Sequence, residues 1–395
     1  MTSPVVTAAS ALAFGADPAG TAGEAAAMVR SRLGAPATLA VVFVHPDLAR
    51  DPEPLLQAVH HHLAPAALVG CTGEAIIGDG REVEDRPAVS VWGAVMPGAR
   101  ITPIRAFSGP GIDGSTEFAG WPDGPSPEGV GRDDLLILLA DPFTFRADVL
   151  LSRMNAGEWH PPIVGGMASG GSRPGQHRLL LDGRWFDDGA VGLAVGGVPF
   201  TTAVSQGCAP IGPEMVVTDA EDGGVVFELA GKPAIAKLEE VIGGLDAEER
   251  RLAGEGLMAG LVIDENRPEY ERGDFLVRGI LGGDPQTGAV QLGEQVRIGQ
   301  TLRLHVRDAD SADEDLNATL DAASARLGTN VSGALLFTCN GRGTRMFPGP
   351  DHDARAVDER MPGSAVAGFF CNGEIGPVGG RSFLHSFTAT MAVFG

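Results

Sequence analysis

Residues 39–74 read LAVVFVHPDLARDPEPLLQAVHHHLAPAALVGCTGE. Residues 39–44 are continuously apolar, as in a strand that is buried on both faces. Asp51-Pro52 supplies an N-cap residue and a proline for the first turn of a helix, whose apolar positions 55, 56, 59 and 63 keep helical spacing. Residues 67–71 form a second apolar strand that runs into Thr72-Gly73-Glu74. A strand, a helix and a strand in this order predict an α/β architecture with the helix on a sheet face.

The same plan occurs further along the chain. A strand at 135–140, the cap Asp141-Pro142, a helix through 149–154 and a strand at 163–166 form a second copy. A third copy has a strand at 301–306, a helix over 316–327 and strands at 334–338 and 366–371. The helices expected at 22–33 and 316–327 both end in Arg-Leu-Gly. We therefore expect two related halves, beginning near Ala11 and Thr301, that superpose.

Segments 88–95, 190–195 and 385–394 follow glycine-rich turns and are typical of antiparallel strands. The predicted fold is therefore α/β, with layered mixed β-sheets covered by helices and built from repeated strand-helix-strand units. A seam is expected at Gly231-Lys232-Pro233, where a helix follows an acidic hairpin. This seam predicts an N-terminal domain over 1–230 and a C-terminal domain over 231–395.

Composition excludes several classes of protein. The net charge of −22 arises from 29 Lys and Arg against 51 Asp and Glu, and no basic cluster is suited to several phosphates, so we expect no nucleic-acid partner. No stretch approaches the roughly 20 apolar residues of a membrane helix, and the N-terminus lacks a secretory signal. We expect a bacterial, cytoplasmic protein without membrane contact.

Cysteine and glycine patterns do not indicate a bound metal or cofactor. The four cysteines, Cys71, Cys208, Cys339 and Cys371, contain no Cys-x-x-Cys pair, so a zinc site is not expected. The run 60–62 is three histidines that point in different directions on a helix and indicate a solvated helix end. Signatures of dinucleotide-binding loops, P-loops and nucleophile elbows are absent. We therefore expect no cofactor.

Polar residues follow the glycine-rich ends of several apolar strands. Two such ends read Cys339-Asn340-Gly341-Arg342 and Cys371-Asn372-Gly373-Glu374, and a third carries Glu74. Neighbouring parallel strands lie about 4.8 Å apart, so the first two loops are predicted to line one pocket. An Arg and a Glu there suit the carboxylate and ammonium of an amino-acid-like ligand. The structural alternative is a set of turns with an internal salt bridge.

Two cysteines in these loops allow an enzymatic alternative. Cys339 or Cys371 would become a nucleophile if His385 activated its thiol. Buried cysteines at the ends of apolar strands are more often packing residues. The predicted ligand-binding set accordingly contains both cysteines and His385 beside Asn340, Arg342, Asn372, Glu374 and Glu74, and no residue is assigned as catalytic.

The glycine-rich motifs resemble those of the FIST family. Leu68-Val-Gly-Cys-Thr-Gly-Glu74, the turn at 165–170 and Gly207-Cys-Ala-Pro-Ile-Gly212 resemble its N-terminal domain. Leu336-Phe-Thr-Cys-Asn-Gly-Arg-Gly343 and 368–377, with the run at 385–389, resemble its C-terminal domain. The resemblance implies a signal-input module that senses a small molecule, with amino acids as candidates, and that acts through a separate signalling protein. A cysteine-dependent hydrolase or transferase and a ligand-free interaction scaffold are the alternatives.

Overall fold

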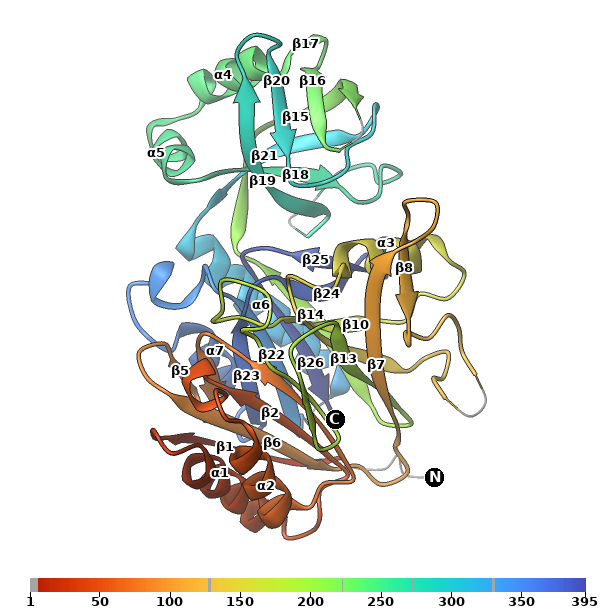
Figure 1. Cartoon of the computed structure of the whole chain (residues 1–395). Coiled ribbons are helices and arrows are strands. Elements are labelled where there is room, and N and C mark those ends of the chain that lie inside the picture. The colour runs from red at the N-terminus through yellow and green to blue at the C-terminus, as the bar shows by residue number, and fades with distance from the viewer. Residues whose placement is uncertain (1–5, 127–128, 222, 271–272, 329–330) are drawn as a thin grey trace. The chain divides into compact units, whose positions relative to one another are not determined.

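The computed structural model describes residues 6–126, 129–221, 223–270, 273–328 and 331–395 (Figure 1). The chain divides into two compact units. The first comprises Met1–Val204, Leu316–Leu384 and Thr388–Gly395, and the second comprises Ser205–Asp315 and His385–Phe387. No helix among the described residues is long and apolar enough to span a bilayer. These units partition the chain differently from the boundary expected at 230/231, which stays a prediction about family domains.

Three mixed sheets form the first unit in the part of the chain that the structure describes. Sheet A has the order β1 (Thr7–Phe14), β6 (Ala88–Val95), β2 (Leu39–Val44), β3 (Ala67–Thr72), β11 (Leu179–Leu181), β12 (Arg184–Phe186). Sheet B has the order β14 (Phe200–Gln206), β26 (Thr388–Phe394), β22 (Gly333–Cys339), β23 (Ala365–Cys371), β4 (Ile76–Gly78), β5 (Arg81–Val83). Sheet C has the order β25 (Arg381–His385), β24 (Glu374–Val378), β10 (Ile163–Met167), β9 (Leu135–Ala140), β13 (Ala190–Gly196), β7 (Arg100–Pro110), β8 (Thr116–Ala119).

The three sheets share one pattern. Each contains one parallel pair of strands, which is β2–β3 in sheet A, β22–β23 in sheet B and β9–β10 in sheet C. An antiparallel strand lies beside the first strand of each pair, and it is β6 in sheet A, β26 in sheet B and β13 in sheet C. The second strand of each parallel pair also has a hairpin as its neighbour in the sheet, and this hairpin belongs to another copy of the repeat. The hairpin after β3 joins sheet B, the hairpin after β23 joins sheet C, and the hairpin after β10 joins sheet A. The repeat predicted from the sequence is thus confirmed, and its three copies exchange hairpins in a cycle.

The inner faces of the three sheets meet in one apolar core. Alternate strand residues point inward, and Phe43, Phe337 and Phe369 from sheets A and B lie in the same cluster as Leu139 from sheet C. The Phe43 and Phe369 ring centroids are 5.0 Å apart, and those of Phe337 and Phe369 are 5.9 Å apart. Each buried Phe side chain contributes about 1.5–3 kcal/mol, so this cluster stabilises the junction of the sheets.

Helices cover the outer face of each sheet. α1 (Pro18–Leu33) and α2 (Glu53–Leu63) pack on sheet A, α3 (Ala147–Ala156) on sheet C, and α6 (Ala309–Leu327) and α7 (His352–Arg360) on sheet B. Asp17 caps α1 by accepting from the Gly20 N–H at 2.9 Å, as expected. The cap expected at Asp51 is displaced, because α2 begins at Glu53 with Pro52 at its N-cap position. Sheets covered on both faces explain the continuously apolar strands.

The second unit is an antiparallel sheet with the order β15-β21-β18-β19-β20-β16-β17. An additional pairing of β15 with β16 closes six of these strands into a ring, and α4 (Ala234–Gly244) packs on the core inside this unit. The strands and the remaining helix are β15 (Cys208–Glu221), β16 (Val225–Leu229), β17 (Lys232–Pro233), α5 (Ala247–Glu255), β18 (Leu257–Val262), β19 (Phe275–Asp284), β20 (Ala289–Leu292), β21 (Thr301–Arg307).

The strand expected at 301–306 therefore has a different place from the one predicted. It is β21 and belongs to the second unit. The strand of sheet B that matches β1 of sheet A in position is β14, which lies before the second unit in the sequence. An insertion of more than one hundred residues between β14 and α6 separates the two parts of this copy. Local periodicity predicts that a segment forms a strand but not which sheet the strand joins.

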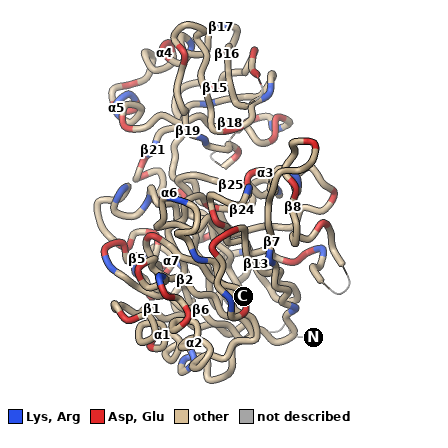
Figure 2. The backbone as a smooth tube through the Cα atoms, in the orientation of Figure 1, with Lys and Arg blue, Asp and Glu red and all other residues tan. Residues whose placement is uncertain are grey.

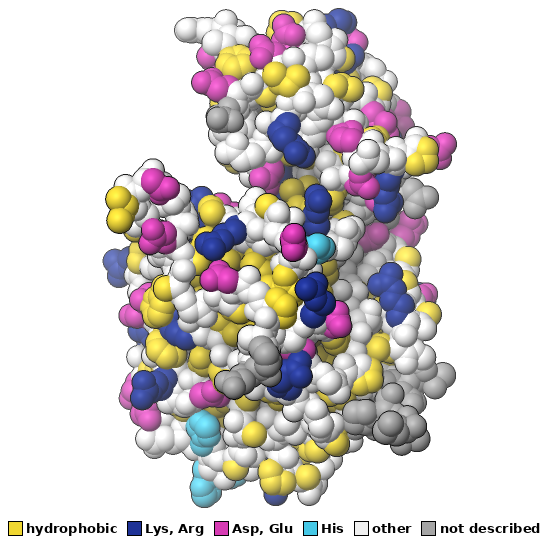
Figure 3. Space-filling view, turned by 90° about the vertical axis from the view of Figure 1, so that its right-hand side faces the viewer, with side chains coloured by type: hydrophobic (Ala, Val, Ile, Leu, Met, Phe, Trp, Pro, Cys, Tyr) yellow, Lys and Arg dark blue, Asp and Glu magenta, His cyan; other side chains and the backbone are white. Residues whose placement is uncertain are grey.

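Charged residues are dispersed along the chain. Figure 2 shows Lys and Arg interspersed with Asp and Glu along the described backbone. On the face shown in Figure 3, basic side chains lie singly or in small groups among acidic, apolar and neutral ones.

Candidate functional site

Equivalent loops follow the second parallel strand of each sheet. Gly70, Gly165 and Gly368 stand opposite Val42, Leu138 and Leu336 in the strand register. A Cβ added at these glycines would lie 2.1, 1.9 and 2.0 Å from the carbonyl oxygen of those partners. A side chain does not fit at this position, which explains why all three strands carry glycine there. Residues 71–75, 166–170 and 369–373 thus form three equivalent strand ends, each with the loop that follows it.

Ser169 connects these loops to one another. Its hydroxyl accepts from the Glu74 N–H at 2.7 Å and donates to the Phe370 carbonyl oxygen. Its own N–H donates to the Thr72 carbonyl oxygen at 3.2 Å. The Ser169 side chain is buried, and its hydroxyl pairs with backbone groups of two neighbouring strand ends. Ser169 therefore joins the ends of β3, β10 and β23.

Arg342, which follows the end of β22, forms a buried ion pair with Asp353. Its Nε donates to Asp353 Oδ2 and its Nη2 donates to Asp353 Oδ1, both at 2.7 Å. Both residues have no exposed surface. Burial by itself would raise the pKa of Asp353, but the Arg342 charge and the hydrogen bonds from His352 and Arg342 hold that pKa well below its usual range. The sequence predicts that the Arg342 guanidinium binds a ligand carboxylate, whereas in the structure its Nε and Nη2 bind Asp353.

Glu82 extends this buried network from the hairpin β4–β5. Its Oε1 accepts from the N–H groups of Asp353 and Ala354, at 2.8 and 3.0 Å. These N–H groups belong to the first turn of α7, where an anionic or acidic group is favoured. Burial and the Asp353 charge raise the pKa of Glu82 to about 8, against the opposing effect of the two backbone hydrogen bonds. Glu82 is therefore mainly protonated at neutral pH.

Glu374 is a second buried carboxyl, at the start of β24. Its Oε2 accepts from the N–H of Thr388 at 3.1 Å and from the Thr388 hydroxyl at 2.9 Å. Burial raises the pKa of Glu374 to about 8, although hydrogen bonds from Thr388 and Cys339 and the charge of Arg342 act to lower it. These influences place Cys339, Arg342 and Glu374 in one electrostatic environment. At neutral pH the Glu374 carboxyl is mainly neutral and can donate a hydrogen bond.

Three polar atoms in this region lack a full hydrogen bond. Asn340 Oδ1, Arg342 Nη1 and Glu374 Oε1 are buried and have no partner of hydrogen-bond geometry among the described residues. The Cys339 thiol, a weak donor, is one of the groups that lower the pKa of the Glu374 carboxyl. Glu82 Oε2 is buried without a partner as well. Each such atom costs about 1–3 kcal/mol when nothing satisfies it.

The predicted residue Glu74 lies nearer to solvent. Its Oε1 accepts from Arg345 Nη2 at 2.5 Å, and the two side chains are 41% and 56% exposed. Arg345 Nη1 donates to the Asn340 carbonyl oxygen at 2.8 Å, so this ion pair joins the loop after β3 to the loop after β22. An exposed pair of this kind contributes at most about 1 kcal/mol.

The remaining predicted residues have different environments. Asn372 is exposed, and its N–H donates to the Met167 carbonyl oxygen at 3.0 Å. Cys371 is buried, and burial followed by the charge of Glu374 raises the pKa of its thiol. Cys339 is partly exposed. His385 is assigned to the second unit, so its role beside Cys339 stays a prediction.

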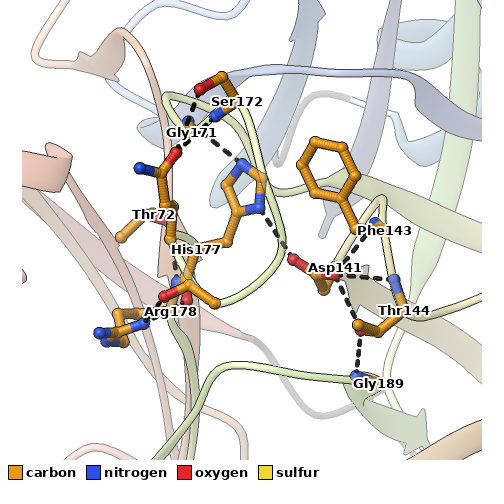
Figure 4. A network of polar contacts seen from close by, with 11 residues as sticks. Thr72, Asp141, Phe143, Thr144, Gly171, Ser172, His177, Arg178 and Gly189 are labelled. Carbon is orange, nitrogen blue, oxygen red and sulfur yellow. Dashed lines mark hydrogen bonds and ion pairs between the residues drawn. The ribbon is translucent and has the colours of Figure 1, made fainter.

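A further buried polar network lies at the end of β9 (Figure 4). His177 Nδ1 lies 2.8 Å from Asp141 Oδ2, and His177 Nε2 accepts from the Gly171 N–H at 3.2 Å. Asp141 Oδ1 accepts from the N–H groups of Phe143 and Thr144 and from the Thr144 hydroxyl. Burial would raise the pKa of Asp141, but hydrogen bonds from His177 and Thr144 lower it. Because both ring nitrogens of His177 are engaged, this pair orders two loops and does not present a base to a ligand.

A pocket of about 350 Å³ lies elsewhere in the first unit. Its polar lining includes Ser10, Arg32, Asp79 and Asp358, and none of the predicted site residues lines it. Arg32 Nη1 and Asp79 Oδ1 form an ion pair at 3.3 Å in its wall.

Sequence reasoning missed the partners that complete these networks, namely Ser169, Asp353, Glu82, Thr388 and the pair Asp141–His177. Ser169 lies in the glycine-rich turn at 165–170, and the sequence indicates only a capping role for Asp141. Glu82 and Asp353 are separated by 271 positions, so no spacing rule connects them. The feature that could have identified these residues is that each is a polar residue in an otherwise apolar strand end or turn.

The fold and these networks define an α/β protein in which three related sheets surround one core and their strand-end loops gather buried polar groups. The FIST N domain matches residues 38–232, and the FIST C domain matches residues 234–377. The chain therefore belongs to the FIST family, as its motifs indicated. FIST domains are generally associated with sensory signal transduction.

Mycobacterial proteins are similar over nearly the full chain. Uncharacterized protein MT0897 of Mycobacterium tuberculosis (strain CDC 1551 / Oshkosh) is 43% identical over 378 residues, which cover 94% of each chain. Uncharacterized protein Rv0628c of Mycobacterium tuberculosis (strain ATCC 25618 / H37Rv) is 42% identical over 382 residues, which cover 94% of this chain and 95% of the relative.

Proposed function

We propose that this protein is a signal-input protein that binds a small molecule where the loops after β22 and β23 meet. The ligand contacts Asn340, Arg342 and Glu374, with Cys339 beside them. The association of FIST domains with sensory signal transduction supports the general role. A separate signalling protein then reads the occupied state.

The observation that carries this proposal is the set of three buried atoms without partners. Buried polar atoms in native proteins are usually paired with protein or water, and three atoms without a protein partner on adjoining loops support a ligand that supplies the partners. Arg342 Nη1 donates, Asn340 Oδ1 accepts, and protonated Glu374 donates or accepts. A ligand with both a carboxylate and an N–H donor satisfies this set. Amino acids and closely related metabolites are therefore the candidate class.

Thermal stabilisation by added compounds tests this proposal. A ligand at 100 times its dissociation constant should stabilise the first unit by about 2.7 kcal/mol. We expect one or more amino acids or related metabolites to raise the melting temperature of the first unit by several degrees. Tryptophan fluorescence follows that unit selectively, because Trp92, Trp121, Trp159 and Trp185 all lie in it.

Single substitutions at the proposed site show whether the stabilisation arises there. Glu374→Gln and Asn340→Ala should each reduce the shift, while Asn372→Ala, at the exposed Asn of the neighbouring loop, reports how far the site extends. Arg342→Ala is unsuitable because its loss would leave Asp353 buried without a partner. If no compound shifts the melting temperature, or if Glu374→Gln and Asn340→Ala leave the shift unchanged, the three atoms are satisfied by ordered water and the site assignment is wrong.

A cysteine-dependent hydrolase or transferase is the second candidate. The observation that favours it is the partly exposed Cys339 beside the Glu374 carboxyl. Rapid alkylation of Cys339 at pH 7 together with turnover of an ester or amide substrate supports this alternative. Alkylation at the rate of an ordinary thiol, with no turnover, excludes it.

A further inference from the structure

Cys339 and Cys371 are neighbours at the ends of two parallel strands. They stand opposite each other in the register of β22 and β23, and the Asn340 N–H donates to the Cys371 carbonyl oxygen at 3.0 Å. Strand alternation places Cys339 on the same face as Phe337, and Cys371 on the same face as Phe369. Those two rings pack against each other in the inner core. The two thiols therefore share one face of the sheet.

The spacing of these strands is compatible with a disulfide. Adjacent strands lie about 4.8 Å apart, and disulfides form across Cα separations of about 4.4 to 6.8 Å. The usual Cβ separation is about 3.8 Å, so in-register parallel neighbours must draw together slightly. A bridge here is thus feasible and is expected to be easily reduced.

The two sulfurs have unequal access and different surroundings. Cys339 is partly exposed, and its Sγ accepts from the Gly341 N–H at 3.4 Å. The Arg342 guanidinium and the Glu374 carboxyl both interact electrostatically with Cys339. Cys371 is buried, and its thiol donates to the Phe369 carbonyl oxygen at 3.7 Å. Cys339 is thus suited to first attack, and Cys371 to the second step.

We propose that Cys339 and Cys371 form a peroxide-sensitive dithiol pair. In the first step the Cys339 thiolate attacks one oxygen of hydrogen peroxide, the O–O bond breaks, and the products are a sulfenic acid at Cys339 and hydroxide. In the second step the Cys371 sulfur attacks the Cys339 sulfur, the S–O bond breaks, and water leaves with the Cys371 proton. The peroxide is reduced to two waters, and the two thiols are oxidised to one disulfide.

The bridge also alters the proposed ligand site, and this consequence rests on the proposed function. A disulfide directs the Cys339 sulfur toward Cys371 and removes its proton, so the thiol no longer acts on the Glu374 carboxyl. Oxidation should then weaken ligand binding without unfolding the first unit. The chemistry of the thiols does not depend on any ligand, so the two proposals fail separately.

Mass spectrometry of the full chain tests the pair. The reduced protein is treated with a small excess of hydrogen peroxide, quenched, alkylated, unfolded and digested with trypsin. Arg342 and Arg360 are cleavage sites between the cysteines, so a bridge joins two separate peptides. We expect one intramolecular link between these peptides, a loss of two hydrogen atoms from the intact mass, and full reversal by dithiothreitol.

Serine variants assign the steps. Cys339→Ser should abolish oxidation, and Cys371→Ser should leave a sulfenic acid at Cys339 that dimedone traps. Cys208→Ser, in the second unit, and Cys71→Ser, at the end of β3, are matched controls that should retain the link. A link through Cys71 or Cys208, oxidation of Cys339 to sulfinic acid without any link in the parent protein, or no oxidation of Cys339 overturns the proposal. Unchanged ligand affinity in the bridged protein contradicts only the proposed effect of the disulfide on ligand binding.

Discussion

Replacing Arg342 by methionine should sharply destabilise the first unit. The substitution keeps an unbranched side chain of comparable length but removes two hydrogen bonds of 2.7 Å to Asp353. Asp353 then keeps its contacts with Thr338 Oγ1 at 3.3 Å and His352 Nδ1 at 2.9 Å. Because Asp353 is fully buried, its charge is left largely uncompensated.

The expected loss is about 3 to 5 kcal/mol in the free energy of unfolding, the range for removing one partner of a buried ion pair. For a unit of this size that loss lowers the melting temperature by roughly 6 to 15 °C. Urea denaturation followed by tryptophan fluorescence measures it, since all four tryptophans lie in the first unit.

A double-mutant cycle separates the ion pair from simple loss of packing. Asp353→Asn alone leaves the Arg342 cation buried, and combining it with Arg342→Met removes both charges. The double variant should therefore be more stable than the sum of the single losses predicts, by at least about 1 kcal/mol. A loss below about 1 kcal/mol for Arg342→Met, or strictly additive single losses, would refute the conclusion that this pair stabilises the loop after β22.

Three further predictions concern the meeting point of the loops. Ser169→Ala leaves the Glu74 N–H and the Phe370 carbonyl oxygen without their shared hydroxyl and should cost about 1 to 3 kcal/mol in urea denaturation; a cost near zero contradicts its connecting role. Burial raises the pKa of Glu374 to about 8, so the stability from its protonated form is complete below about pH 4 and is lost as the pH rises through 8. Glu374→Gln should therefore roughly halve the decline in unfolding free energy between about pH 5 and 8, because Glu82 titrates in the same range and contributes the other half. An unchanged decline shows that Glu374 does not contribute to it. Gly166→Ala places a Cβ 2.3 Å from Cys371 Sγ and should lower the melting temperature. Adding Cys371→Ala removes that sulfur and should restore most of the lost melting temperature; no recovery shows that the clash with Cys371 is not the cause.

Part of the candidate site could be predicted from the sequence. Parallel strands that follow one another through a helix end at the same edge of a sheet, so polar residues at 339–342 and 371–374 had to lie close together. Strand register confirms the neighbours Cys339 and Cys371. The partner of Arg342 could not be predicted in this way, because Asp353 approaches it from a separate helix, and the buried Glu82 arrives on a hairpin from another copy of the repeat.

The sequence by itself determined the α/β class, the strand-helix-strand repeat, the family and the glycine-rich strand ends, because these depend on local periodicity and on backbone sterics at single residues. Only the tertiary structure decided which sheet each hairpin joins, that β21 lies in the second unit while β14 completes sheet B, and which carboxyls are buried. Those outcomes depend on contacts between residues hundreds of positions apart. The free energy of burying a charge or an unpaired hydrogen-bonding group is set by such contacts and not by the neighbouring sequence.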